Sequence, residues 1–329
     1  MYNHIIYASL VAFVICLAGG PLIIPLLRRF KFGQVVRDDG PQAHLAKTGT
    51  PTMGGIFLIC AIIIAALVVA RGNANLMLAA VLVTLGFGLI GFIDDFIKVA
   101  LKRSLGLKAR QKLIGQIIIA LIFAIYAARN PAIGTIWRLP FSDVQWNLKW
   151  LFVPITMFVV VGTANSVNLT DGLDGLASSI TFVVAGAFAL IYGMLELMGA
   201  TVYASNMHNM AVFAGAVAGA CLGFLIFNWH PAKVFMGDTG SMALGGAVAA
   251  MAVISRSQLL LVIIGGIYVV EALSVIMQVV YFKATGGKRI FKMTPIHHHF
   301  ELSGMTEERV VVFFTIAAII LNLVAILAF

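Results

Sequence analysis

The strongest constraint on the fold is the recurrence of long apolar stretches with few charged residues along the whole chain. A helix needs about 20 largely apolar residues to cross a bilayer. Ten stretches approach that length: 5–27, 53–70, 72–93, 113–128, 150–170, 175–195, 209–229, 239–255, 257–282 and 310–329. Only 11% of the residues are charged, against about 25% in a soluble domain. The sequence therefore predicts an all-α integral membrane protein of about ten transmembrane helices, forming one polytopic domain over residues 1–329.

Two segments depart from this pattern. The ninth stretch contains Gly265, Gly266 and Glu271, and paired glycines weaken a helix, so we expect this helix to be bent or broken. Segment 131–149 has alternating, Pro-broken character, which indicates a small hairpin on the outer side.

The basic residues predict the orientation in the membrane. With ten spans, one side receives 17 of the 22 Lys and Arg residues, and basic connections stay in the cytoplasm. This side is expected to be cytoplasmic, with both termini outside. Topology explains the net charge of +9, so nucleic acid is not an expected partner.

Four connections on the cytoplasmic side carry the polar residues that point to chemistry. The first, GFIDDFIK (91–98), ends an apolar helix with Asp94 and Asp95 and places Lys98 one turn later. Adjacent carboxylates repel unless a cation or another partner is present. This pattern fits Mg²⁺ or substrate contact plus a general base, or a solvated helix end neutralised by Lys98.

The second connection, NSVNLTDGLDGLA (165–177), repeats Asn168, Asp171 and Asp174 every three residues. In helical geometry the two aspartates would share a face; the alternative is a polar loop in which Asp174 caps the next helix. Oxygen ligands of this kind suit Mg²⁺.

The third connection, FNWHPAKVFMGDTGSMALGG (227–246), places Asp238 between glycines just before a helix. It could hold a metal that bridges an anion, or act as an N-cap. Asn228 could hydrogen-bond a ligand, and Phe235 could stack on a base, although core packing explains Phe235 equally well.

The fourth connection, TPIHHHFE (294–301), contains His297, His298 and His299. Consecutive residues do not share a helical face, so contacts with phosphate or ribose oxygens fit better than a zinc site. The segment HLAKTGTPTMGG (44–55) adds Lys47 and Thr52 to the same side. Acidic, imidazole and ammonium groups from separate connections thus meet at one membrane face, which favours metal-dependent phosphoryl transfer on anionic substrates.

These motifs resemble those of the polyprenyl-phosphate N-acetylhexosamine-1-phosphate transferase superfamily, and most closely its phospho-N-acetylmuramoyl-pentapeptide transferase branch. GTPTMGG, DDFIK, NLTDGLDGLA, FMGDTGS and TPIHHHFE follow one another in the order that the family shows, over nearly the whole chain.

The resemblance implies transfer of phospho-MurNAc-pentapeptide from UDP to undecaprenyl phosphate in the bacterial inner membrane. Lipid I and UMP would be the products, made in peptidoglycan synthesis with Mg²⁺ as cofactor by a homodimer. It assigns Mg²⁺ to Asp238, the base to Asp94 with Asp95 beside it, and a catalytic role to His297. Substrate contacts are implied for Lys47, Thr52, Lys98, Asn168, Asp171, Asp174, Asn228, Phe235, Gly237, His298 and His299. Arg110 stands where many members have Lys, so either Arg110 or Lys112 would bind phosphate.

Three alternatives remain open on sequence grounds. One is a related transferase that uses UDP-GlcNAc. Another is an ion-coupled transporter, which a broken helix and an acid within a span would suit, although most acids here lie at one face. The last is a scaffold that binds the lipid carrier without catalysis, which the intact aspartates disfavour. The sequence leaves both a one-step transfer and a two-step path through a covalent Asp open.

Overall fold

The computed structural model describes residues 2–29, 47, 49–101, 105–198 and 201–329. It is almost entirely helical, with one small antiparallel hairpin. The long helices are α1 (Tyr2–Arg29), α2 (Gly55–Val69), α3 (Asn75–Ala100), α4 (Ala109–Arg129), α5 (Phe152–Thr170), α6 (Leu176–Met198), α7 (Thr201–Asn228), α8 (Gly237–Ile254), α10 (Gly266–Ala284) and α12 (Glu307–Leu327). The short elements are β1 (Ile136–Arg138), β2 (Gln145–Asn147), the 3₁₀ turn η2 (Lys149–Leu151), α9 (Leu261–Ile264) and α11 (Ile296–Glu301).

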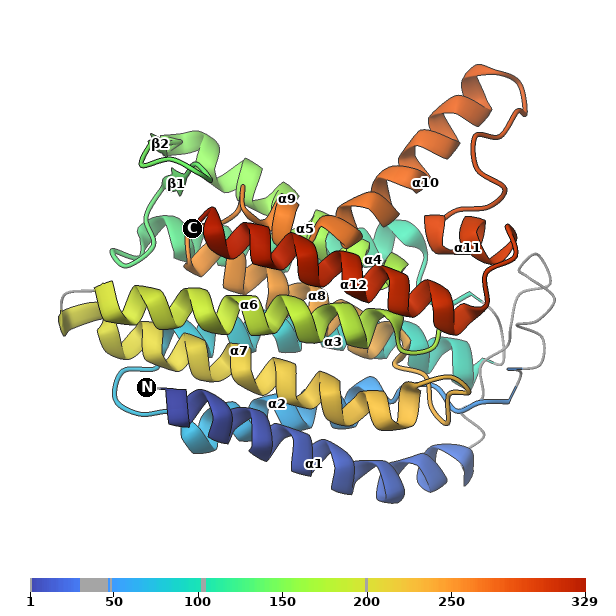
Figure 1. Cartoon of the computed structure of the whole chain (residues 1–329), viewed down its shortest axis with the longest axis horizontal. Helices are drawn as coiled ribbons and strands as arrows, with labels where there is room; N and C mark the ends of the chain where they lie inside the picture. Colours follow the sequence, from blue (N-terminus) through green and yellow to red (C-terminus); the bar gives the residue numbers. More distant parts are fainter. Residues whose placement is uncertain (1, 30–46, 48, 102–104, 199–200) are drawn as a thin grey trace.

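The predicted membrane architecture is confirmed. Within the described residues, nine helices are long and apolar enough to cross a membrane, and α2 adds a shorter apolar helix of 15 residues. Their positions match the ten apolar stretches of the sequence. The two chain ends lie at the same end of the bundle (Figure 1), as an even number of crossings requires.

The ninth stretch is broken, as its glycines predicted. Helix α9 ends at Ile264, Gly265 adopts a non-helical conformation, and α10 starts at Gly266. Figure 1 shows α10 leaving the bundle at a steep angle, and the chain then returns from its far end to α11, which lies close to the bundle. The predicted hairpin is also present: β1 pairs with β2 in antiparallel register, with Trp137 opposite Trp146.

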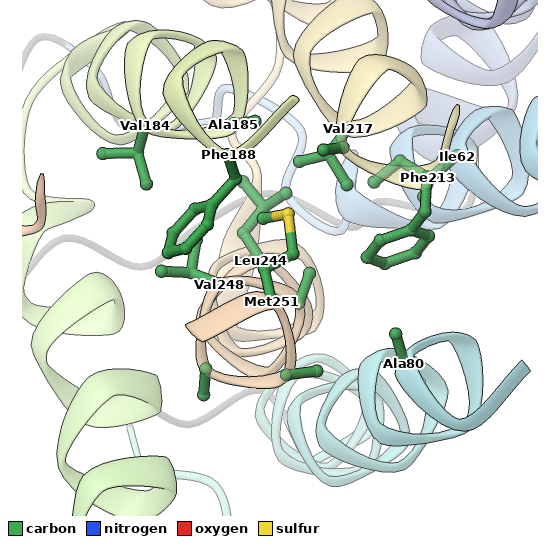
Figure 2. Close-up of a cluster of buried hydrophobic side chains, with 14 of the residues drawn as sticks. Ile62, Ala80, Val184, Ala185, Phe188, Phe213, Val217, Leu244, Val248 and Met251 are labelled. Atoms are coloured by element: carbon green, nitrogen blue, oxygen red, sulfur yellow. The ribbon is translucent and has the colours of Figure 1, made fainter. Parts of the chain in front are cut away.

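Helix α8 lies at the centre of the bundle. Its sequence is rich in glycine and alanine, and all its residues from Thr239 to Ile254 are buried. Small residues let membrane helices approach closely, and van der Waals packing then holds them together. Figure 2 shows side chains of α8 packing against those of neighbouring helices: Leu244, Val248 and Met251 of α8 meet Val184, Ala185, Phe188, Phe213, Val217, Ile62 and Ala80.

Large apolar side chains on the outer helices remain exposed, as expected where lipid is the solvent. Examples are Leu22 of α1, Ile122 of α4, Val280 of α10 and Leu327 of α12. The packing of the inner helices around α8 fixes the relative positions of the helix ends that carry the polar motifs.

Candidate active site

Three carboxylates meet where α3 ends and α8 begins. Asp94, Asp95 and Asp238 offer oxygen atoms that lie within 4.8 Å of one another; we call this group the acidic centre. Helix α3 runs to Ala100, further than the apolar stretch predicted, so both of its aspartates belong to its last turns. Asp94 and Asp95 are buried, whereas the Asp238 side chain is 20% exposed.

Two lysines neutralise much of the negative charge of the acidic centre. The Lys98 ammonium lies 2.6 Å from Asp94, 3.5 Å from Asp95 and 2.9 Å from Asp238. The Asp94 pair has the i,i+4 spacing of helical ion pairs. Lys112, from the first turn of α4, lies 2.9 Å from the same Asp238 oxygen. The structure therefore brings Lys112 into the site, whereas Arg110 is exposed at the start of α4.

Hydrogen bonds orient the two aspartates of α3. Asp95 Oδ2 accepts two bonds of 2.8 Å, one from the Thr239 amide and one from its hydroxyl. Asp94 Oδ1 accepts a bond from the Leu107 amide at 2.8 Å. Asp95 is thus committed to the first turn of α8, because its Oδ2 already receives two donors.

Asp238 is the most accessible member of the acidic centre and the one that α8 presents. Its Oδ1 accepts a 2.8 Å bond from Asn168, which also donates to Ser241. Gly237 has a φ of +72°, a backbone conformation that glycine tolerates best, and a side chain there would collide with Asp95 and Thr52. The sequence alternative of an N-cap is wrong, because Met236 is the cap residue of α8 and Asp238 lies within the first turn.

Asp171 and Asp174 occupy a turn rather than a shared helical face. Helix α5 ends at Thr170 and α6 begins at Leu176, so the helical geometry predicted for this motif is wrong. Desolvation, together with the negative charges of Asp238, Asp95 and Asp174, raises the pKa of Asp171 well above its usual value. The negative charges of the acidic centre therefore act on Asp171, whereas Asp174 forms its ion pairs in a second polar group.

Asp174 belongs to a second polar group, the Lys47 cluster, formed by Lys47, Asp174, His230 and Glu307. The Lys47 ammonium lies 2.7 Å from Asp174 and 2.6 Å from Glu307. His230 Nδ1 lies 3.0 Å from Asp174 and 3.3 Å from Glu307. The amide of Asp174 also donates to Glu307 at 2.6 Å. This cluster ties the α5–α6 turn to the start of α12.

Other predicted ligand-binding residues help to build the walls around these groups. Asn228 is buried, accepts bonds from Gly175 and Ser178 and donates to Val234. Its amide group is therefore occupied by bonds within the protein, two with backbone groups and one with the Ser178 hydroxyl. Phe235 is half-buried, and its backbone bonds the Pro51–Gly54 segment, next to the buried Thr52.

The three histidines of α11 have different environments. His297 is completely buried. The His298 side chain is 12% exposed, and its Nδ1 lies 2.8 Å from Glu301. His299 accepts a bond from the Lys292 amide at 3.2 Å. Of the three, His298 and His299 are the accessible ones.

Two polar residues of the Lys47 cluster were not singled out from the sequence. His230 lies inside the third motif, and Glu307 lies just before the last apolar stretch. A histidine before proline and an acid at a helix start are common for structural reasons, so neither gave a local signal. Only the contact between distant segments identifies them.

The chain is a polytopic helical bundle with acidic and basic groups gathered at one end, and its family match assigns it to a class of transferases. The sequence model of Glycosyl transferase family 4 matches residues 77–256, which contain the whole acidic centre. This match covers more than half of the chain.

Full-length relatives define the family more closely. The chain is 52% identical over 326 residues to the phospho-N-acetylmuramoyl-pentapeptide-transferase of Clostridioides difficile, covering 99% of this chain and 98% of that protein. It is 49% identical to the Bacillus subtilis protein of the same name, with 98% and 97% covered. A relative from Desulforamulus reducens is 51% identical, with 99% and 96% covered. The chain therefore belongs to the phospho-N-acetylmuramoyl-pentapeptide-transferase family.

Proposed function

We propose that this membrane protein transfers phospho-MurNAc-pentapeptide from UDP-MurNAc-pentapeptide to undecaprenyl phosphate, forming lipid I and releasing UMP. The observation that carries the proposal is the acidic centre with Lys98 and Lys112 at one end of a membrane bundle. Transfer between a soluble diphosphate and a lipid phosphate needs negative charge to be neutralised next to a membrane. Family membership makes the nucleotide sugar and the polyprenyl phosphate the substrate pair to test first.

The donor set of the acidic centre fits Mg²⁺. Three carboxylates with oxygens within 4.8 Å of one another are hard ligands of the kind that this ion prefers. Asp238 would be the principal ligand, because it is the most exposed of the three and Asp95 already accepts two hydrogen bonds. When bound, Mg²⁺ would supply charge neutralisation at the diphosphate.

The chain's own groups have separate tasks in this proposal. An oxygen of the lipid phosphate attacks the β-phosphorus, the bond from β-phosphorus to the bridging oxygen breaks, and UMP leaves. Asp94 accepts the proton of the lipid phosphate, where one is present. Lys98 and Lys112 stabilise the charge that develops on the phosphates.

Substrate recognition would use the groups around the acidic centre. Lys47 and Asp174 would contact the nucleotide, together with Asp171, Asn168 and Phe235. His298 and His299 would contact phosphate or sugar oxygens, since they are the accessible histidines of α11. Thr52, Asn228 and Gly237 would shape the wall of the site.

The setting follows from the same residues. The basic connections favour a cytoplasmic location for the acidic centre and external termini, within one membrane domain over residues 1–329. A homodimer in the bacterial inner membrane completes the proposal.

The test is UMP release by the purified protein in detergent. We expect release only when UDP-MurNAc-pentapeptide, undecaprenyl phosphate and Mg²⁺ are all present, and none in EDTA. Asp238→Asn should abolish release without unfolding the protein, because amide oxygens bind cations more weakly than carboxylates. Asp143→Asn removes an exposed acid in the outer hairpin segment and is the matched control.

The outcomes separate the alternatives. Release from UDP-GlcNAc but not from UDP-MurNAc-pentapeptide would assign the related activity instead. Full activity of Asp238→Asn would remove Asp238 from the metal site. Equal activity in EDTA and Mg²⁺ would refute the metal dependence.

A further inference from the structure

Glu271 is an acid in the membrane-embedded part of the chain that the reaction above does not use. It lies on α10, shortly after the break at Gly265, and its side chain is 0% exposed. The residue facing it is His297 of α11, also 0% exposed, with Nδ1 3.1 Å from a Glu271 carboxylate oxygen. A buried ionisable group in a membrane helix is costly, and it is retained where it has a specific partner.

The polar atoms of this pair depend on each other. Among the residues that the structure describes, neither carboxylate oxygen of Glu271 and neither ring nitrogen of His297 has a hydrogen-bond partner of regular geometry. The nearby Ser274 hydroxyl donates to the backbone carbonyl of Glu271, at 2.7 Å, and leaves the carboxylate free for the imidazole. The 3.1 Å contact therefore pairs the two buried groups with each other, and a shift of either side chain would deprive both of this polar partner.

The opposite edge of the imidazole packs against the α5–α6 turn. A Cβ atom at Gly172 would overlap with His297 Nε2. Gly172 lies next to Asp171, which senses the acidic centre, and two residues before Asp174, which belongs to the Lys47 cluster. The ring therefore fills the space between Glu271 and the turn that carries both aspartates.

We propose that Glu271 and His297 form one positioning unit that holds the 171–175 turn in place, and that His297 acts through this turn without touching substrate. The inference deepens the proposed function, since the turn carries two of the nucleotide-site aspartates. A carboxylate that accepts from one ring nitrogen of a histidine fixes both its tautomer and its orientation. Here the oriented imidazole ring packs against the backbone at Gly172.

Two substitutions of Glu271 separate positioning from space-filling. Glu271→Leu keeps much of the volume but cannot accept a hydrogen bond, whereas Glu271→Gln keeps an oxygen acceptor for the imidazole. If Glu271 only fills an apolar interior, leucine should be tolerated at least as well as glutamine. If Glu271 orients His297, the glutamine variant should keep the activity that the leucine variant loses.

The first readout is the kinetics of UMP release. We expect Glu271→Leu to raise KM for the nucleotide sugar about tenfold, the lower range for losing a group that orients a functional histidine. KM for the lipid phosphate should change less than about twofold, since only the nucleotide-site turn is disturbed. Glu271→Gln should stay close to wild type, and Ser274→Ala, a buried polar residue on the same helix, is the matched control.

The second readout does not depend on turnover. Hydrogen exchange by mass spectrometry should show faster exchange of the 171–175 amides in Glu271→Leu and unchanged exchange in Ser274→Ala. A wild-type protein that releases no UMP would refute the proposed function, while this exchange comparison would still decide the positioning role. Gly172→Ala, which forces the ring to move, serves if Glu271→Leu does not fold, and should raise the same KM.

A double variant completes the test. Glu271→Leu with His297→Asn should be no worse than the more damaging single variant, because residues that act as a unit are not additive. Multiplicative losses in the double variant, equal behaviour of the leucine and glutamine variants, or unchanged exchange in the turn would each overturn the proposal.

Discussion

Lys98 is the residue whose removal most directly tests the electrostatics of the acidic centre. Its ammonium lies within 3.5 Å of all three carboxylates. Lys98→Met keeps the length of the side chain and removes the charge. Three carboxylates would then face one another while Lys112 still pairs with Asp238, and like charges at this separation repel.

The magnitude follows from burial. Removing one partner of a buried ion pair costs about 3–5 kcal/mol, and exposed pairs contribute about 0–1 kcal/mol. The Lys98 side chain is 32% exposed, while Asp94 and Asp95 are nearly enclosed. We therefore expect a loss of about 2 kcal/mol of stability in EDTA, between these two limits.

Mg²⁺ should restore most of this loss, because a divalent cation replaces the missing positive charge. Mg²⁺ stabilises the wild type as well, so the deficit shrinks because the variant, with more uncompensated negative charge, binds Mg²⁺ more tightly. A Kd that is about tenfold lower in the variant offsets about 1.4 kcal/mol at saturating Mg²⁺. The deficit of Lys98→Met relative to wild type should consequently be large in EDTA and small in saturating Mg²⁺.

The assay is thermal unfolding in detergent, followed by intrinsic fluorescence, with EDTA and with a Mg²⁺ titration. The apparent Tm of Lys98→Met in EDTA should fall by on the order of 5 °C. Lys283→Met removes an exposed charge near the end of α10 and should leave Tm unchanged. A deficit of equal size in EDTA and in Mg²⁺ would show that Lys98 does not balance the charge of the acidic centre.

Three further expectations concern groups around the acidic centre. Thr239→Val removes one of the two hydrogen-bond donors to Asp95 and should lower the unfolding free energy by about 1–3 kcal/mol. Chemical denaturation measures this change, and an unchanged free energy would show that the Thr239 hydroxyl does not stabilise the fold. The raised pKa of Asp171 means that the folded protein keeps a proton that the unfolded chain releases above about pH 4. The stability that Asp171 contributes therefore falls as pH rises from there to the folded pKa. In EDTA, Asp171→Asn should flatten this part of the plot of unfolding free energy against pH, and an unaltered slope would refute the raised pKa. Glu307→Gln should cost about 1–3 kcal/mol, because it weakens the hold of α12 on Asp174, and its deficit, unlike that of Lys98→Met, should be the same in EDTA and Mg²⁺.

The sequence predicted the membrane fold well because the signals are local. Each apolar stretch specifies a helix without reference to the others, and Gly265 breaks the ninth helix wherever that helix lies. The outer hairpin is equally local, since alternation and prolines define it. Asp94, Asp95, Lys98 and the first turn of α8 also emerged, because each lies at the end of an apolar stretch.

The internal arrangement of the site depends on contacts that no local pattern encodes. The spacing of Asp171 and Asp174 suggested one helical face, but α5 ends at Thr170, both residues lie in a turn, and Asp174 pairs with Lys47. Lys47 and Glu307 are separated by 260 residues, and only the folded chain brings them into contact. The burial of His297 likewise depends on α10 and the Gly172 turn.

The turn between α5 and α6 is where these long-range contacts converge. Asp171 senses the acidic centre, Asp174 is fixed by the Lys47 cluster, and Gly172 rests against His297. A ligand that orders this turn through one group reduces the entropy that a second ligand must lose at the other. Because such coupling is reciprocal, Mg²⁺ should tighten UMP binding by the same factor by which UMP tightens Mg²⁺ binding. Calorimetric titration of each ligand with and without the other measures both factors, and independence of the two would mean that the turn is rigid before either ligand arrives.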